Sequence, residues 1–88
     1  MKIKDGYVLR KFADKYIALA AEDAADNNNV LVTLNPSGAY AWGLMESDVT
    51  YDEVVKGLLE KYNATEETIK ADLDEFLAIL RSSDLLDE

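Results

Sequence analysis

The chain of 88 residues contains no cysteine and no histidine. Without cysteine it has no disulfide bond, thiolate nucleophile or cysteine metal ligand. Without histidine it lacks the commonest general base and metal ligand. No apolar run is long enough to cross a bilayer, and the first residues show no signal-peptide pattern. We therefore expect one cytoplasmic domain over residues 1–88 that uses no cofactor or metal and contacts no membrane.

Basic residues are scarce as well. Nine Lys and Arg residues face eighteen Asp and Glu residues, which gives a formal net charge of -9. Such a chain repels the phosphate backbone of nucleic acids and attracts a basic peptide or a basic protein surface. The simpler explanation is that surface acid keeps the protein soluble. The hydrophobic fraction of 49% is ample for a packed core and argues against disorder.

The motifs of common enzymes are missing too. The sequence has no P-loop, no glycine-rich dinucleotide fingerprint and no nucleophile elbow. Asp72 and Asp74 are close in sequence, but residues two apart point to different faces of a helix. The segment around Glu22, Asp23 and Asp26 lacks the glycine and the final glutamate of a calcium loop. We therefore expect a protein that is not an enzyme.

Strand-forming residues fill the first third of the chain. They predict strands over residues 6–12, 16–20 and 30–34. Residues 21–29 are acidic and rich in asparagine, which favours a solvated loop. Residues 1–5 are expected to be loose. Short connections favour an antiparallel meander, which leaves the outer side of the third strand unpaired.

The single proline marks the change from strand to helix. Pro36 follows Asn35, a good N-cap, and it suits the first position of a helix over residues 36–45. Trp42, the only tryptophan, lies in this helix. A ring of this size buries a large apolar area, so we expect Trp42 to fill the corner of the core.

Two further helices follow. Thr50 and Glu53 match the capping box of a helix over residues 51–62. Thr65 caps a third helix, which begins with acidic residues at the positive end of its dipole. Apolar residues recur at the helical period in both helices, which predicts one buried stripe on each. The stripe of the third helix is Ile69, Leu73, Phe76, Leu77 and Leu80.

The predicted fold class is α+β, with a three-stranded antiparallel sheet followed by three helices (β-β-β-α-α-α). This order is like that of a winged helix-turn-helix, which raises the hypothesis of a DNA-binding regulator. The third helix would then enter the major groove, but its polar face carries more acidic than basic residues. We therefore expect no nucleic-acid partner. A generic protein-interaction domain is a second alternative.

Three segments resemble the PqqD family, small proteins that bind the leader segment of ribosomally made, modified peptides. The most specific is residues 34–42, with the sequence LNPSGAYAW, followed by residues 49–55 and 72–77. The resemblance extends over nearly the whole chain, from about residue 6 to residue 86. The family also serves several modified-peptide pathways, and the sequence does not separate these.

The resemblance implies that a leader peptide adds as a strand beside the third strand and lies against the third helix. The implied contact residues are Val30, Leu31, Val32, Thr33, Leu34, Lys70, Leu73, Asp74 and Leu77. An acidic rim that includes Asp74 would favour a leader with lysine or arginine. The resemblance implies a second partner, a radical S-adenosylmethionine maturase or a similar modifying enzyme, which would hold any iron–sulfur cluster itself. The peptide, the product and the oligomeric state are left open.

Overall fold

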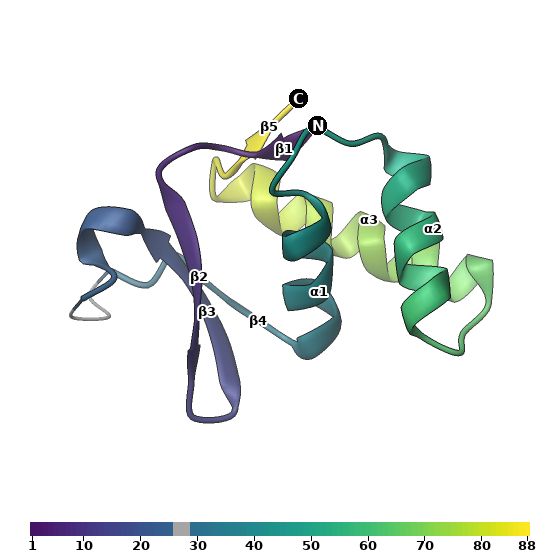
Figure 1. Cartoon of the computed structure of the whole chain (residues 1–88), viewed down its shortest axis with the longest axis horizontal. Helices are drawn as coiled ribbons and strands as arrows, with labels where there is room; N and C mark the ends of the chain where they lie inside the picture. The colour runs from purple at the N-terminus through teal and green to yellow at the C-terminus, as the bar shows by residue number, and fades with distance from the viewer. Residues whose placement is uncertain (26–28) are drawn as a thin grey trace.

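The computed structural model describes residues 1–25 and 29–88 (Figure 1). The elements are β1 (Lys2–Ile3), β2 (Tyr7–Phe12), β3 (Lys15–Ala20), the 3-10 helix η1 (Ala21–Asp23), β4 (Val32–Leu34), α1 (Pro36–Leu44), α2 (Tyr51–Lys61), α3 (Glu66–Ser82) and β5 (Leu86–Asp87). Strands β2, β3 and β4 form an antiparallel sheet in that order. The predicted α+β fold, with a meander sheet followed by three helices, is confirmed.

The third strand is shorter than predicted. It begins at Val32, whereas Val30 and Leu31 precede it with 43% and 45% of their surface exposed. The N–H of Leu31 still donates to the carbonyl oxygen of Ala18 at 2.9 Å. The composition of residues 30–34 predicted a strand correctly but not its first residue. The side chains of Val30 and Leu31 are more exposed than those of Val32 and Leu34, so they gain less from packing on the sheet. Of the predicted loop over residues 21–29, residues 26–28 lie outside the described residues.

The expectation that residues 1–5 are loose was wrong. β1 pairs antiparallel with β5, with Ile3 opposite Leu86. Ile3 is 5% exposed and belongs to the core, which gives this short ladder an apolar anchor. Lys4 Nζ also pairs with Asp84 Oδ1 at 2.6 Å, 80 residues away along the chain. Pairing over such a separation leaves no local pattern from which it could be predicted.

The three predicted helix starts are confirmed by their caps. Asn35 Oδ1 accepts a hydrogen bond from the Gly38 N–H at 2.8 Å at the start of α1. Thr50 and Glu53 form the capping box of α2, with distances of 3.1 Å and 2.9 Å. Thr65 accepts from the N–H at the third position of α3. Each cap satisfies donors that a helix start would otherwise leave free.

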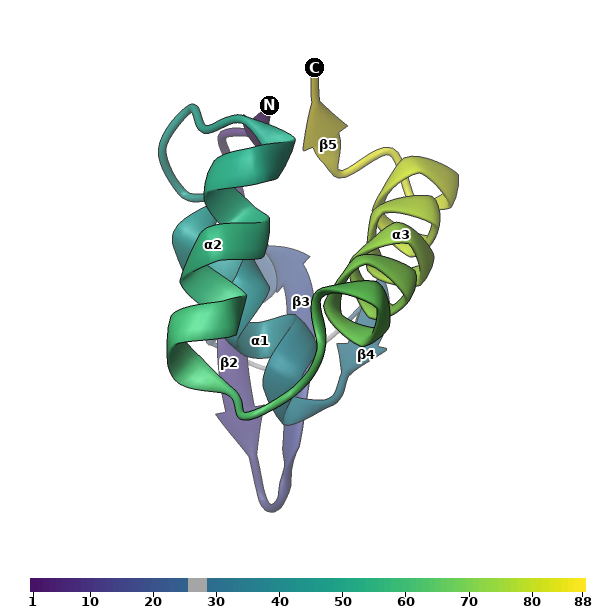
Figure 2. The same ribbon diagram turned by 90° about the vertical axis from the view of Figure 1, so that its right-hand side faces the viewer.

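Helix α1 lies between the sheet and the other two helices (Figures 1 and 2). Trp42, on α1, is 1% exposed, as predicted. It shares one core with Ala18 of β3, Leu34 of β4 and Leu80 of α3. The core therefore fixes α1 and α3 beside the end of β4.

Within the described residues, no helix has both the length and the apolar content that crossing a membrane requires.

Candidate functional site

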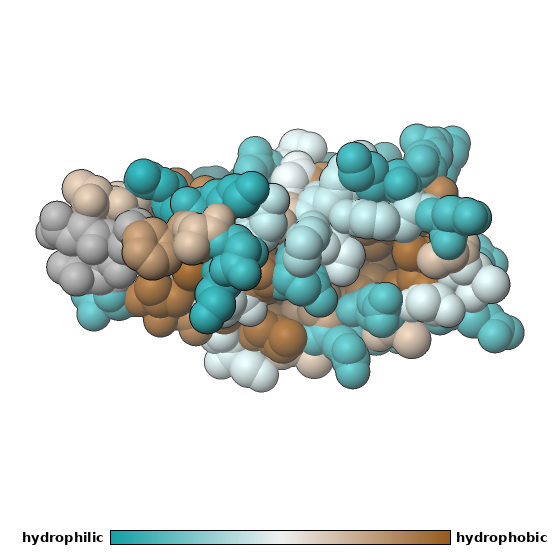
Figure 3. All heavy atoms as spheres, turned by 90° about the horizontal axis from the view of Figure 1, so that it is seen from below, coloured by the Kyte–Doolittle hydropathy of each residue, from teal (hydrophilic) through white to brown (hydrophobic). Residues whose placement is uncertain are grey.

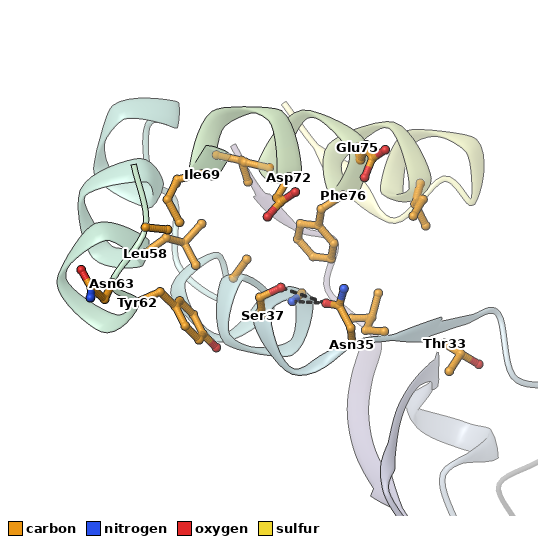
Figure 4. Close-up of a pocket in the computed structure, with 16 residues that line it drawn as sticks. Thr33, Asn35, Ser37, Leu58, Tyr62, Asn63, Ile69, Asp72, Glu75 and Phe76 are labelled. Carbon is orange, nitrogen blue, oxygen red and sulfur yellow. Dashed lines mark hydrogen bonds between the residues drawn. The ribbon is translucent and has the colours of Figure 1, made fainter. Parts of the chain in front are cut away.

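A groove of about 450 Å³ opens where β4 ends, between α1, the end of α2, and α3 (Figure 4). It is lined by Thr33, Leu34, Asn35, Ser37, Gly38, Ala41, Leu58, Tyr62, Asn63, Ala64, Ile69, Asp72, Leu73, Glu75, Phe76 and Ile79. A hollow with apolar atoms at its base is visible between hydrophilic side chains on the helical part of the face in Figure 3. The groove thus combines an apolar floor with a polar rim, the usual character of a binding site.

The turn from β4 into α1 builds one wall of this groove. Asn35 Oδ1 accepts from the Gly38 N–H and from the Ser37 hydroxyl, at 2.8 Å and 3.0 Å. A β-carbon on Gly38 would lie 3.1 Å from Asn35 Oδ1 and 3.5 Å from Cδ1 of Phe76. Because glycine has no such atom, α1 approaches α3 here without filling the space between them.

Helix α3 supplies the opposite wall. Ile69, Phe76 and Ile79 give it apolar surface, and Asp72 and Glu75 give it carboxylates. Ile69 and Phe76 are 5% and 6% exposed, so they also belong to the core, whereas Ile79 is 45% exposed. Ile69, Asp72, Phe76 and Ile79 follow one another at intervals of three or four, and Glu75 lies four residues before Ile79, so all five lie on one side of the helix. In Figure 4 the Phe76 ring projects from α3 toward α1.

The open edge of the sheet lies next to the groove. Within the described residues, β4 pairs with β3 and with no other strand. Val32 and Leu34 are buried and Thr33 is exposed, in the alternation of a half-buried strand. Thr33 and Leu34 also line the groove. An extended segment entering the groove would therefore meet unpaired backbone groups of β4.

The structure brings together only part of the set of contact residues that the resemblance implies. Thr33, Leu34 and Leu73 line the groove, and Val32 lies on the same edge strand. Leu73 is 1% exposed, so it contributes floor rather than rim. Val30 and Leu31 are exposed just ahead of β4. Leu77 is 2% exposed within the core and does not line the groove.

Lys70 and Asp74 lie outside the groove lining as well. Asp74 accepts a hydrogen bond from the Tyr51 hydroxyl at 2.8 Å, and therefore faces α2. That bond raises the pKa of the Tyr51 phenol above its ordinary value. Lys70 Nζ lies 3.8 Å from Glu66 Oε1, one turn earlier on α3. These two side chains are engaged within the protein, on another side of the helix.

The groove residues that were not predicted from the sequence include all of its charged side chains. Asp72 and Glu75 carry its carboxylates, and Ser37 and Asn63 line it from α1 and from the loop after α2. The helical period could have grouped Asp72 with Ile79, because both lie on the same flank of the buried stripe, next to Ile69 and Phe76. The sequence does not indicate on which side of that stripe the surface of α3 remains uncovered by other elements. Among the described residues, no group of three or more acidic side chains is placed to hold a metal ion.

An open sheet edge beside a groove between helices is the setting in which a domain binds an extended peptide. The chain belongs to the PqqD family, since the profile described as Coenzyme PQQ synthesis protein D (PqqD) matches residues 13–86. Among solved structures, it is similar to "TbiB1 in Complex with the TbiA(beta) Leader Peptide". The identity is 26% and the TM-score 0.74, with 99% of this chain and 95% of that chain covered. A search of curated protein sequences found no match. The predicted family and fold class are thereby confirmed.

Proposed function

We propose that this protein binds the leader segment of a ribosomally made precursor peptide and presents it to a modifying enzyme. The leader adds as a strand to the free side of β4, and its side chains enter the groove between α1 and α3. The observation that carries the proposal is the unpaired edge of β4 beside the groove. Membership of the PqqD family and the likeness to TbiB1, solved with a leader peptide, support it.

Because β4 is short, backbone and side-chain contacts contribute differently to peptide binding. β4 has three residues, so few main-chain hydrogen bonds can form along it. Each of these contributes about 0.5–1.5 kcal/mol net. Apolar side chains that enter the groove add about 25 cal/mol for each Å² removed from water. We therefore infer that β4 sets the register of the bound peptide and that the groove provides most of the selectivity among peptides.

The proposed contact residues follow from this division. Val32, Thr33 and Leu34 provide the edge, and Val30 and Leu31 extend the exposed approach to it. The groove adds Leu73 to this set, together with Phe76 and Ile79 of α3. Asp74 and Leu77 hold α3 in place from behind this wall, and Lys70 pairs with Glu66 of the same helix. None of the three contacts the peptide directly in this proposal.

The second proposed partner is the enzyme that modifies the peptide. A radical S-adenosylmethionine maturase is the form that the family resemblance implies. This domain then carries no chemistry of its own and acts by raising the local concentration of the substrate peptide at that enzyme. Because the precursor is made on ribosomes, we place the encounter in the cytoplasm.

Peptide binding can be tested with synthetic peptides that cover the short open reading frames near the gene. Titration calorimetry is expected to find one that binds, and N-methylation of its central amides is expected to weaken binding, because a methyl group removes the ladder donor. Hydrogen exchange should then slow at the amides of β4. Binding that is insensitive to N-methylation, or that protects a different face, would contradict strand addition.

A further inference from the structure

The charges around the groove are all of one sign. Among the described residues that line it, Asp72 and Glu75 are acidic and none is Lys or Arg. Both carboxylates are exposed, and neither forms an ion pair within the described part of the chain. By contrast, the nearby Glu66 is paired with Lys70. The groove therefore presents two free negative charges to whatever occupies it.

These carboxylates stand beside apolar surface rather than apart from it. Asp72 and Glu75 lie about one turn apart on α3, on the same wall as Phe76 (Figure 4). Ile79 lines the groove about one turn after Glu75. Phe76 is 6% exposed and Ile79 is 45% exposed, which leaves Ile79 accessible as an apolar contact. Lysine and arginine have apolar stems and charged ends, so they can cover such a wall while the charge reaches its rim.

We propose that the groove selects leader segments in which a large apolar residue is accompanied, within a few positions, by lysine or arginine. The apolar residue occupies the floor over Gly38 and Leu34, and the cation lies between Asp72 and Glu75. This inference rests on the proposed function and names the class of peptide. The net charge of -9 supports it, since the field of the whole chain attracts a cationic segment.

Selection from a random peptide library displayed on phage tests the inference without knowledge of the natural leader. The wild-type protein should enrich peptides that contain a large apolar residue together with Lys or Arg. The double variant Asp72→Asn/Glu75→Gln should keep the apolar preference and lose the basic one. The variant Asp72→Lys/Glu75→Lys should enrich peptides that contain Asp or Glu instead of Lys or Arg. The matched control, Glu46→Gln/Glu60→Gln, removes two exposed charges outside the groove and should select as the wild type does.

A double-mutant cycle then locates the contact. The selected peptide and its Lys→norleucine analogue are titrated against each variant by calorimetry. Against the wild type, the analogue should bind about fivefold more weakly at low salt, the upper range for an exposed ion pair. Against Asp72→Asn/Glu75→Gln the two peptides should bind alike. With the control variant the difference should be retained.

The outcomes separate this inference from peptide binding itself. If the wild type enriches apolar peptides without an excess of Lys or Arg, the inferred charge selection is wrong and the peptide-binding function still stands. The same would hold if the two peptides differed in affinity for Asp72→Asn/Glu75→Gln as much as they do for the wild type. A Ser37→Phe variant, which places a ring in the groove, gives the background of the selection. If the wild type enriches nothing above that background, peptide binding in the groove is itself wrong.

Discussion

The Tyr51 hydroxyl donates a hydrogen bond of 2.8 Å to the Asp74 carboxylate, and this bond ties the first turn of α2 to the middle of α3. It accounts for the absence of Asp74 from the groove, although the family resemblance implied that Asp74 contacts the peptide. The side chain that faces α2 helps to fix the position of the wall, and side chains on the other flank of α3 line the groove.

The pH dependence of stability should report this bond. The pKa of Tyr51 is raised in the fold, first by the hydrogen bond to Asp74, so the neutral phenol is the favoured form. Its contribution is complete below the ordinary phenol pKa of about 10 and is lost as pH rises through the raised value. Denaturant melts of the wild type and Tyr51→Phe should therefore differ at neutral pH and converge in alkali. A difference that stays constant to high pH would contradict this.

Trp42→Ala should be strongly destabilising. The ring is 1% exposed, and its removal leaves a large cavity between the sheet and the helices. We expect a loss of about 3–5 kcal/mol in the free energy of unfolding. Urea melts followed by far-ultraviolet circular dichroism measure it, with Trp42→Phe as the conservative comparison. A loss below about 1 kcal/mol would be inconsistent with a ring at the centre of the core.

Proline substitutions in β4 and at Leu31, just before it, should show two kinds of effect. Leu31 donates to Ala18, so Leu31→Pro removes a bond within the sheet and should lower the melting temperature. The N–H groups of successive strand residues point to opposite sides. One of Val32→Pro and Thr33→Pro should therefore stay folded and lose affinity for a bound peptide by calorimetry. If both stay folded and bind with wild-type affinity, the edge of β4 is not the binding site.

Association with a basic peptide should depend on salt. The field of a chain with net charge -9 accelerates the approach of a cation, and mobile ions screen it beyond about 8 Å at physiological ionic strength. The association rate by stopped-flow fluorescence should fall as salt is added, while the dissociation rate changes less. The Glu46→Gln/Glu60→Gln variant should lower the rate slightly without altering peptide choice. A flat salt series would limit the net charge to a role in solubility.

Local patterns in the sequence predicted much of the fold. The caps at Asn35, Thr50 and Thr65 marked three helix starts, because each cap is formed by residues close in sequence. The pairing of β1 with β5 could not be predicted, since the two strands lie at opposite ends of the chain. The groove was predicted only in part for a similar reason. Which flank of α3 stays open depends on how α2 packs against the other, a relation between distant segments.

The ladder between β1 and β5 has a consequence for the order of folding. The entropic cost of closing a loop grows with its length, and this ladder closes nearly the whole chain, whereas β2 and β3 close a two-residue turn. We expect the ends to join last and to open first. Native-state hydrogen exchange should therefore find the Lys4 amide, which donates to the Leu85 carbonyl at 2.9 Å, released before the amides of β3. A peptide that binds at β4 would slow exchange there and leave this early opening of the ends unchanged.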